Sequence, residues 1–426
     1  MRPSLVISSF ATIALVVTGC SSSGGGETTT ASPGASGGKV TLTLATFNEF
    51  GYEELVKEYM AANPNVTIQM KKAATSNEAR DNMNTRLAAG SGLSDIEAIE
   101  VDWLPELLQY PDKFVDLKSD AVSGRWLDWK AAQATTADGK LIGYGTDIGP
   151  QAVCYRADLF KAAGLPTERT AVAALLGNTL DSYLAAGRQF KAKSKVPWME
   201  SSGALFNAMV NQVKNAYEKD DGTIIATENP EVKALYDKVL AASAEGLTAR
   251  LAQWSDDWTG SFQRNGFATM ICPGWMLGVI KGNAAKVNGW DIADTFPGGG
   301  GNWGGSFLTV PSQSKHPQEA KALAEWLTAP EQQIKAFVSK GTFPSQTAAL
   351  EDPKLLSSKN AFFNNAPVGQ ILANRAKAVE VVPFKGPKYS GINDAMQAAI
   401  SRVDIDRTDT PAQSWDKFVT AVKALS

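Results

Sequence analysis

The side chains that most often carry catalysis or bind metals are sparse in this sequence. Its one histidine, His316, precedes Pro317 at an expected helix start and has no second His or Cys at metal-ligand spacing. Histidine-based catalysis and most zinc chemistry are therefore excluded. The four glycines at 298–301 lack the Lys and Ser/Thr of a phosphate-binding loop, so we interpret them as a flexible turn. We expect no cofactor and no metal.

An acidic cluster near the C-terminus resembles the start of a calcium loop. It contains Asp404, Asp406 and Asp409. A calcium-binding loop would need Gly where Asp409 stands and Glu where Trp415 stands. We therefore interpret the cluster as a solvated acidic turn.

Polar and aromatic side chains follow two of the expected strands. Alternating apolar residues predict strands at 40–44 and 66–70, an apolar run predicts a third at 96–101, and helical spacing predicts helices at 52–60 and 83–87. This order is typical of a parallel open sheet, in which ligands bind beyond the carboxyl ends of the strands. Asn48-Glu49 and Asp102-Trp103 stand at two such ends, and we expect them at a binding site.

Several later segments match a known family in order and spacing. They read GTDIGP at 145–150, MICPGW at 270–275, GGSFLTVP at 304–311, GTFPS at 341–345 and GPKYS at 386–390. Together with the opening strand and helix they resemble the family 1 extracellular solute-binding proteins, the sugar receptors of bacterial ABC importers. The resemblance extends from about Lys39 to the C-terminus. It is closest to actinobacterial cello-oligosaccharide receptors and extends, more distantly, to maltose-binding proteins.

The resemblance implies an α/β fold of two lobes, the type II periplasmic-binding-protein fold, with a ligand cleft between lobes joined by hinge crossings. We place the crossings near Thr146-Asp147, Ser306-Phe307 and Lys340-Gly341. The expected first lobe is then 39–147 plus 307–340, and the second is 148–306 plus 341–426. Closure of such lobes needs only a few flexing residues at the crossings.

A sugar site needs hydrogen-bonding carboxylates or amides for the hydroxyls and aromatic side chains for the C–H faces of the rings. All 11 tryptophans lie beyond Cys20. By resemblance, Trp275 is the foremost stacking residue, although it could instead fill the core. The full set of expected ligand-binding residues is Asn48, Glu49, Asp102, Trp103, Asp147, Trp198, Trp258, Trp275, Trp303 and Tyr389. Asp102 and Asp147 could alternatively cap helices or form turns, and we expect Trp126, Trp129 and Trp326 to serve in packing.

We expect the protein not to be an enzyme but to bind a di- or oligosaccharide and deliver it to a membrane permease driven by a cytoplasmic ATPase. A cello-oligosaccharide is favoured, with malto- and xylo-oligosaccharides as alternatives. Two other functions stay open at this stage. A cell-surface glycoside hydrolase would also gather acids and tryptophans, and needs two carboxylates flanking the scissile bond. A sugar sensor would bind the ligand without transporting it.

The N-terminus predicts export and lipid attachment. Arg2 precedes a largely apolar run at 5–17, which is shorter than the about 20 residues that span a bilayer. The run ends in Val-Thr-Gly-Cys, which resembles a bacterial lipobox, so we expect residues 1–19 to be a signal peptide and Cys20 to be diacylated. An ordinary signal peptide with a chance cysteine is the alternative. Two acyl chains suffice for stable attachment to the outer face of a cell membrane, and we expect a Gram-positive actinobacterial source.

Residues 20–38 after the signal consist of Cys20 and a segment of Ser, Gly, Thr and Ala with one Glu and one Pro. Such a segment cannot bury a core, and as a flexible coil it would span roughly 25 Å. The remaining cysteines, Cys154 and Cys272, could pair or stay as buried thiols. The net charge of −3 without a basic block argues against a nucleic-acid partner. We expect a monomer.

Overall fold

The computed structural model describes residues 38–425. The expected signal peptide, the lipidated Cys20 and the linker as far as residue 37 lie outside the described residues. Within residues 38–425, none of the helices combines the length and the apolar character needed to cross a bilayer. Residues 39–425 belong to one compact unit by their contacts, and the elements that position the site are all part of it.

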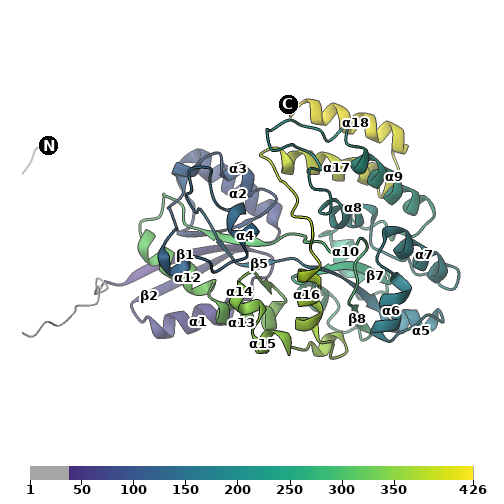
Figure 1. The fold of residues 1–426 in the computed structure, drawn as a ribbon, viewed down its shortest axis with the longest axis horizontal. Helices are drawn as coiled ribbons and strands as arrows, with labels where there is room; N and C mark the ends of the chain where they lie inside the picture. Colours follow the sequence, from purple (N-terminus) through teal and green to yellow (C-terminus); the bar gives the residue numbers. More distant parts are fainter. Residues whose placement is uncertain (1–37, 426) are drawn as a thin grey trace, which may run out of the picture. The chain divides into compact units, whose positions relative to one another are not determined.

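The first sheet has five strands in the order β2-β1-β3-β9-β4. β1 (Val40–Phe47) pairs in parallel with β2 (Val66–Ala73) and β3 (Ile96–Glu100), as the alternating sequence predicts. β9 (Ser306–Thr309) and β4 (Tyr144–Gly145) join it, with β9 antiparallel to both β3 and β4. The sheet is thus mixed, because β9 enters it from a segment far along the chain, which Figure 1 shows as a green strand beside purple and blue ones.

Helices and short 3-10 turns cover this sheet. α2 begins after Thr75, whose side chain accepts a hydrogen bond from the Glu78 backbone, and ends at Gly90, whose φ of 70° favours glycine. The elements are α1 (Glu53–Ala62), α2 (Ser76–Ala89), α3 (Leu104–Leu107), η1 (Pro111–Lys113), η2 (Asp120–Val122), α4 (Asp128–Gln133), α12 (Pro317–Leu327) and α13 (Pro330–Lys340). His316 caps α12, so the expected helix start is confirmed.

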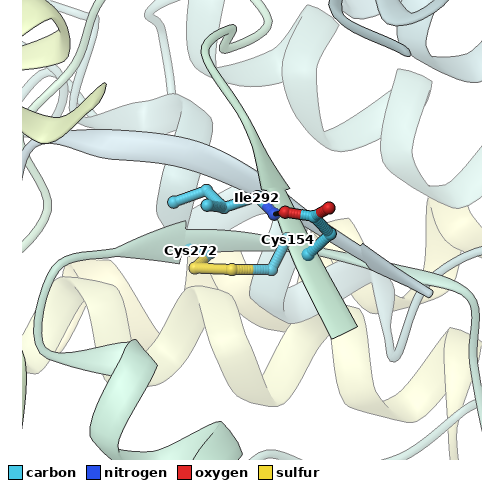
Figure 2. Close-up of a disulfide and its surroundings, with 4 residues drawn as sticks. Cys154, Cys272 and Ile292 are labelled. Atoms are coloured by element: carbon cyan, nitrogen blue, oxygen red, sulfur yellow. Dashed lines mark hydrogen bonds between the residues drawn. A yellow bond between two sulfur atoms is a disulfide. The ribbon is translucent and has the colours of Figure 1, made fainter. Parts of the chain in front are cut away.

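The second sheet has the order β7-β6-β8 and is buried on both faces. β6 (Gln151–Arg156) lies between β7 (Thr269–Pro273) and β8 (Trp290–Ala293), antiparallel to each. Cys154 of β6 and Cys272 of β7 form a disulfide, which settles the pairing that the sequence left open. Figure 2 shows the bridge beside Ile292, which pairs with Cys154 in the ladder.

The helices around the second sheet enclose two apolar clusters. One is built around Trp198 and the other around Trp258 and the disulfide. The elements are α5 (Ala157–Ala162), α6 (Arg169–Leu176), α7 (Leu180–Lys191), α8 (Ser202–Val210), α9 (Pro230–Ala244), α10 (Asp256–Ser261), α11 (Met276–Asn283), α14 (Thr347–Leu350), α15 (Pro353–Leu356), η3 (Ala361–Phe363), α16 (Val368–Lys377), α17 (Tyr389–Asp404) and α18 (Pro411–Lys423).

Three chain segments connect the two sheets. The first runs from β4 into β5 (Asp147–Ile148), which pairs with β10 (Phe343–Pro344) of the third. The second segment leads from β8 into β9 and lies against the first. The Trp303 amide donates to the Gly149 carbonyl, and the Thr146 amide donates to the Ser306 carbonyl. The first segment is therefore hydrogen-bonded to each of the other two.

Helix α13 touches both halves of the fold. Its Ala336 belongs to the apolar cluster of the first sheet, whereas Ile334 and Phe337 belong to a cluster of the second. Two glycines allow close approach to its backbone. A Cβ at Gly51 would lie 2.9 Å from the Ala336 carbonyl oxygen, and a Cβ at Gly278 would lie 2.3 Å from the Lys340 carbonyl oxygen. Any larger side chain would force α13 away from one half.

Candidate functional site

A cavity of about 590 Å³ lies between the elements of the two sheets. Its first wall comes from the ends of β1 and β3 and from α2, and its floor includes Asp147 and the glycines 304 and 305 of the second connecting segment. Its second wall comes from α8, the loop before α10, the start of α11 and one face of α17. The carboxyl ends of β1 and β3 thus meet the cavity, as their sequence order predicts.

An aromatic group forms part of the second wall. Trp275 and Trp303 both line the cavity, with ring centroids 5.6 Å apart in an edge-to-face arrangement. The Trp275 indole N–H donates a 3.0 Å hydrogen bond to the Trp303 carbonyl, which fixes the orientation of the ring. Trp275 is half-buried rather than enclosed. The arrangement leaves part of an oriented indole available to a ligand.

Trp254 is a cavity residue that the sequence interpretation missed. It stacks on Trp275 at 6.2 Å with 24° between the rings, and it is 39% exposed. Its φ is +72°, a conformation that is rare for a bulky residue and costs on the order of 1–3 kcal/mol. Strain of this kind is concentrated at functional sites. No sequence pattern marks Trp254, because neither its φ nor its exposure follows from its neighbours along the chain.

Three of the expected ligand-binding aromatics lie outside the cavity lining, and packing explains each. Trp198 is fully buried among Phe160, Tyr183 and Phe190. Trp258 is buried directly behind Trp254, with ring centroids 5.2 Å apart, so it supports the cavity wall without reaching the cavity.

Tyr389 is the third of these aromatics. It is the first residue of α17 and turns inward onto Tyr217, with ring centroids 5.1 Å apart. The next residue of the helix, Ser390, faces the cavity instead. One step along a helix rotates the side chain by about 100°, so a one-residue difference separates a core residue from a cavity residue.

Asp102 lines the cavity but is already paired. Its carboxylate forms an ion pair with Lys385, whose ammonium lies 4.8 Å from the Tyr389 ring centroid. The Ser390 hydroxyl donates a 2.8 Å hydrogen bond to the Asp102 carbonyl. Asp102 therefore joins the loop before α17 to the end of β3. Trp103, also in the lining, is almost fully buried and its indole N–H donates to the Ser76 hydroxyl at 3.0 Å.

The floor of the cavity contains a buried group of charges. Burial raises the pKa of Asp147, although Lys130 opposes this, and its Oδ1 accepts hydrogen bonds from Thr146 and from the Ser306 amide at 2.7 and 2.9 Å. Burial and the nearby Asp102 charge raise the pKa of Glu100 to about 8, and burial lowers the pKa of Lys130 to about 7. The floor thus holds less charge than its residue types indicate.

Asn48 and Glu49 line the cavity at the end of β1. Asn48 has a φ of +48°, which asparagine tolerates better than most residues. Glu49 forms ion pairs with Lys72 and with Lys340, the latter at 2.7 Å. Partial burial acts to raise its pKa, but the hydrogen bonds from the two lysines lower it. Glu49 is thus an anchored carboxylate at the rim.

Uncharged amides on the second wall were also missed by the sequence interpretation. They are Asn207, Gln253, Asn393 and Gln397. The last two lie on α17, four residues apart, and the polar positions of that helix repeat at helical spacing. This repeat could have predicted from the sequence that the helix has a polar face. It does not distinguish a face that lines a cavity from one that faces solvent.

In the acidic cluster near the C-terminus, Asp406 is exposed as expected, but Asp404 is not solvated. Asp404 is fully buried and accepts hydrogen bonds from the Ser202 amide and from the Ser243 and Thr248 hydroxyls, at 2.6 to 2.7 Å. The expectation for Asp404 was wrong because these three partners lie far away in sequence. Asp404 instead joins α17 to the start of α8 and to α9.

Comparison with known proteins now identifies the class. Residues 54–364 match the family model of the bacterial extracellular solute-binding proteins, and the chain belongs to this family. A solved structure described as an extracellular solute-binding protein of family 1 is 51% identical, covers 91% of this chain and 100% of its own, and superimposes with a TM-score of 0.80. The expected α/β fold of two lobes around a ligand cleft is confirmed.

Two more distant relatives are also similar to this chain. The ABC-transporter-associated binding protein of B. animalis subsp. lactis, solved with β-1,6-galactobiose, is 20% identical over 91% of this chain and 97% of its own, with a TM-score of 0.77. The arabinooligosaccharide-binding protein of Halalkalibacterium halodurans is 21% identical over 365 residues, 82% of this chain and 80% of its own.

Proposed function

We propose that this protein captures a neutral oligosaccharide between its lobes and delivers it to the membrane permease of an ABC importer. The observation that carries the proposal is that the exposed indole of Trp254, stacked on Trp275, shares one cavity with a set of uncharged amides. Indoles bind the C–H faces of sugar rings, and amides both donate to and accept from hydroxyls.

The identity of the sugar is taken from resemblance and from the relatives. Cello-oligosaccharides are favoured by the sequence resemblance, with malto- and xylo-oligosaccharides as alternatives. The ligands of the two distant relatives add arabino-oligosaccharides and β-1,6-galactobiose. These five sugars are the candidates for a binding assay.

Hinge closure accompanies binding in this proposal. The proposed first lobe is 39–147 plus 307–340 and the second is 148–306 plus 341–426, with crossings near residues 146, 306 and 340. Gly304, Gly305 and Gly341 stand at two crossings with φ of 76°, 114° and 87°, and glycine adopts such values without strain. The paired β5 and β10 support a shared bending axis.

The proposed role involves binding without catalysis. The carboxylates of Glu49, Asp102 and Asp394 in the cavity are engaged in ion pairs, and Asp147 is held by two hydrogen bonds. The Glu100 carboxyl, also in the lining, accepts a 2.8 Å hydrogen bond from the Asp102 amide. A hydrolase would need one such group free to donate a proton and another free to attack or to activate water. The ligand should therefore leave the protein chemically unchanged.

We propose that the monomeric receptor works at the outer face of the cell membrane, held by a diacylglyceryl group on Cys20. The lipobox-like sequence before Cys20 supports attachment, and the Ser- and Gly-rich segment after it supports a flexible tether. A tethered receptor stays near its permease while its lobes remain free to bind sugar. Family membership supports the extracellular location.

The test is isothermal titration calorimetry of the purified protein with each candidate sugar, followed by mass spectrometry of the recovered ligand. Micromolar binding of at least one sugar and its recovery intact are expected. Failure of all candidates to bind below about millimolar would refute the oligosaccharide assignment. Release of monosaccharide would instead establish a hydrolase.

A further inference from the structure

Helix α17 presents one polar face to the cavity along most of its length. The lining includes Ser390, Asn393, Asp394, Gln397 and Ser401. These positions repeat every three or four residues and so share one side of a helix. The opposite side carries Ile392, Met396 and Ala399, which are buried in the core. At 1.5 Å per residue, Ser390 and Ser401 are about 16 Å apart along the axis, which exceeds the length of a disaccharide.

The Ser390 end of this face is occupied by contacts with the first lobe. Ser390 donates to the Asp102 carbonyl, and Asp394 accepts a 3.1 Å hydrogen bond from Arg80. Gln397 and Ser401 lie about two and three turns beyond Ser390. Side chains available to a ligand are therefore displaced toward the middle and the far end of the helix.

Hydrogen bonds fix the orientation of the amides in the middle of the face. The Tyr217 hydroxyl donates to Asn393 Oδ1 at 2.9 Å. Asn393 Nδ2 and Gln397 Nε2 then both donate to Asn207 Oδ1, at 3.3 and 2.9 Å. In the part of the chain that the structure describes, no hydrogen bond engages Asn207 Nδ2 or Gln397 Oε1. The group thus offers a fixed donor and a fixed acceptor, which match the two capacities of a hydroxyl.

Close packing between α8 and α17 holds Gln397 in place. A Cβ at Gly203 of α8 would lie only 2.6 Å from Gln397 Oε1. Gly203 also lines the cavity. Because residue 203 has no side chain, the Gln397 carbonyl oxygen can lie against α8 at this point.

We propose that the polar face of α17 binds the third and later units of a linear, neutral oligosaccharide, so that the protein selects for chain length with Gln397 as a specificity-determining residue. This inference rests on the proposed function. The aromatic group would bind one or two rings whatever the chain length. Only longer chains would gain the additional hydrogen bonds with Gln397 and with Ser401, whose hydroxyl donates to Asp406 at 3.2 Å and can accept from the sugar.

The experiment is calorimetry with the di-, tri- and tetrasaccharides of the cello, malto, xylo and arabino series, using the wild-type protein and Gln397→Ala. In the series that binds, the wild-type protein should bind the trisaccharide at least about fivefold more tightly than the disaccharide, since two additional hydrogen bonds contribute about 0.5–1.5 kcal/mol each. Gln397→Ala should weaken trisaccharide binding about 3- to 10-fold and weaken disaccharide binding by a clearly smaller factor.

A second variant separates this effect from a loss of folding. Gly203→Ala should displace the Gln397 amide and lower trisaccharide affinity, while thermal stability stays equal or rises, because alanine favours helix more than glycine does. The matched control is Gly282→Ala in α11, where an added Cβ meets nothing within 4 Å. This control should change neither affinity.

The outcomes distinguish the two proposals. Equal affinity of the wild-type protein for two, three and four units would overturn the chain-length inference and leave the receptor function standing. Equal weakening of all lengths by Gln397→Ala would also overturn it. Binding of no length in any series, together with no binding of β-1,6-galactobiose, would refute the oligosaccharide receptor itself.

Discussion

The Arg80 guanidinium on α2 joins Asp394 on α17 across the cavity, with 3.1 Å between Nη1 and Oδ2. The same guanidinium donates two hydrogen bonds to Glu106, at 2.6 and 3.2 Å, so its position is set from the first lobe. Asp102 and Lys385 add a second ion pair between the same two sides. The arrangement that encloses the cavity is thus stabilised by direct contacts between the lobes.

Replacing Asp394 by Asn should weaken sugar binding modestly. The variant removes one lobe–lobe ion pair and keeps the Arg80–Glu106 pair, so the closed population falls and the apparent affinity falls with it. Because the Asp394 side chain is 56% exposed, we expect only a two- to fivefold effect, or about 0.5–1 kcal/mol, at low salt. Calorimetry at two salt concentrations measures it. The control is Asp237→Asn, which removes a pair within α9. Equal affinities of variant and wild type at low salt would contradict the role of the pair.

Trp254→Ala should lower sugar affinity by about 1–3 kcal/mol, because it removes the exposed indole of the aromatic group. Trp254→Gly should lose as much affinity but keep or gain stability, since glycine tolerates the φ of +72°. Calorimetry and thermal unfolding of both variants supply the two quantities. Tyr110→Ala, at an aromatic residue 54% exposed outside the cavity, should alter neither. Full affinity in Trp254→Ala would remove this residue from the site.

Glu200→Gln should flatten the dependence of stability on pH. Burial raises the pKa of Glu200 to about 8, so between pH 4.5 and 8 the folded state holds a proton that the unfolded state has released. The contribution of Glu200 to the free energy of unfolding of the wild type therefore falls as the pH rises through that interval. Glutamine keeps an oxygen for the 3.2 Å hydrogen bond from Gln253 and cannot ionise. The melting temperature of the variant relative to that of the wild type should therefore be higher at pH 8.5 than at pH 5.

A group with the opposite shift provides the control for this prediction. The hydrogen bond from Arg188 lowers the pKa of Glu245, so its contribution is present at high pH and is lost as the pH falls through the lowered pKa. Both pH 5 and pH 8.5 lie above this pKa, so Glu245→Gln should lower the melting temperature by nearly the same amount at the two pH values. Parallel pH profiles for Glu200→Gln and the wild type would show that Glu200 is ionised in the folded protein.

Loss of the Cys154–Cys272 disulfide should destabilise the second lobe. The two cysteines are 118 residues apart. A disulfide typically stabilises a protein by about 2–4 kcal/mol through the unfolded chain, and a loop of this length favours the upper end of that range. Denaturant unfolding of the double variant Cys154→Ala/Cys272→Ala should show that decrease. Alkylation of the denatured, unreduced wild type should label neither residue, and labelling of both would contradict the bond.

Cys20→Ser should release the protein from the membrane into the medium while its sugar affinity stays intact. The lipid-bearing thiol is lost, but the residues of the cavity are unaffected. Fractionation of cells expressing each form, together with calorimetry of the soluble protein, measures both properties. Sugar uptake by the variant strain should decrease. Retention of the variant in the membrane fraction would refute the proposed anchor.

The sequence predicts the fold further than it predicts the site. Alternation and helical spacing place β1, α1, β2 and β3, because each pattern is a local consequence of burial on one face. The polar residues at the ends of β1 and β3 do meet the cavity. Which aromatic side chains line the cavity is harder to predict, because Trp198 and Trp254 differ in their surroundings rather than in their local sequence. Asp404 and Gln397 likewise depend on partners more than 100 residues away.

The contact of α13 with both halves has a consequence for how affinity can change. Gly51 and Gly278 hold the helix backbone from the two sides at Ala336 and Lys340. Substitutions along α13 would therefore alter the resting balance between open and closed lobes without touching the sugar, and apparent affinity scales with the fraction of protein that is competent to bind. Substitutions in α13 should thus shift the range of sugar concentrations over which the receptor responds, without changing which sugar it binds.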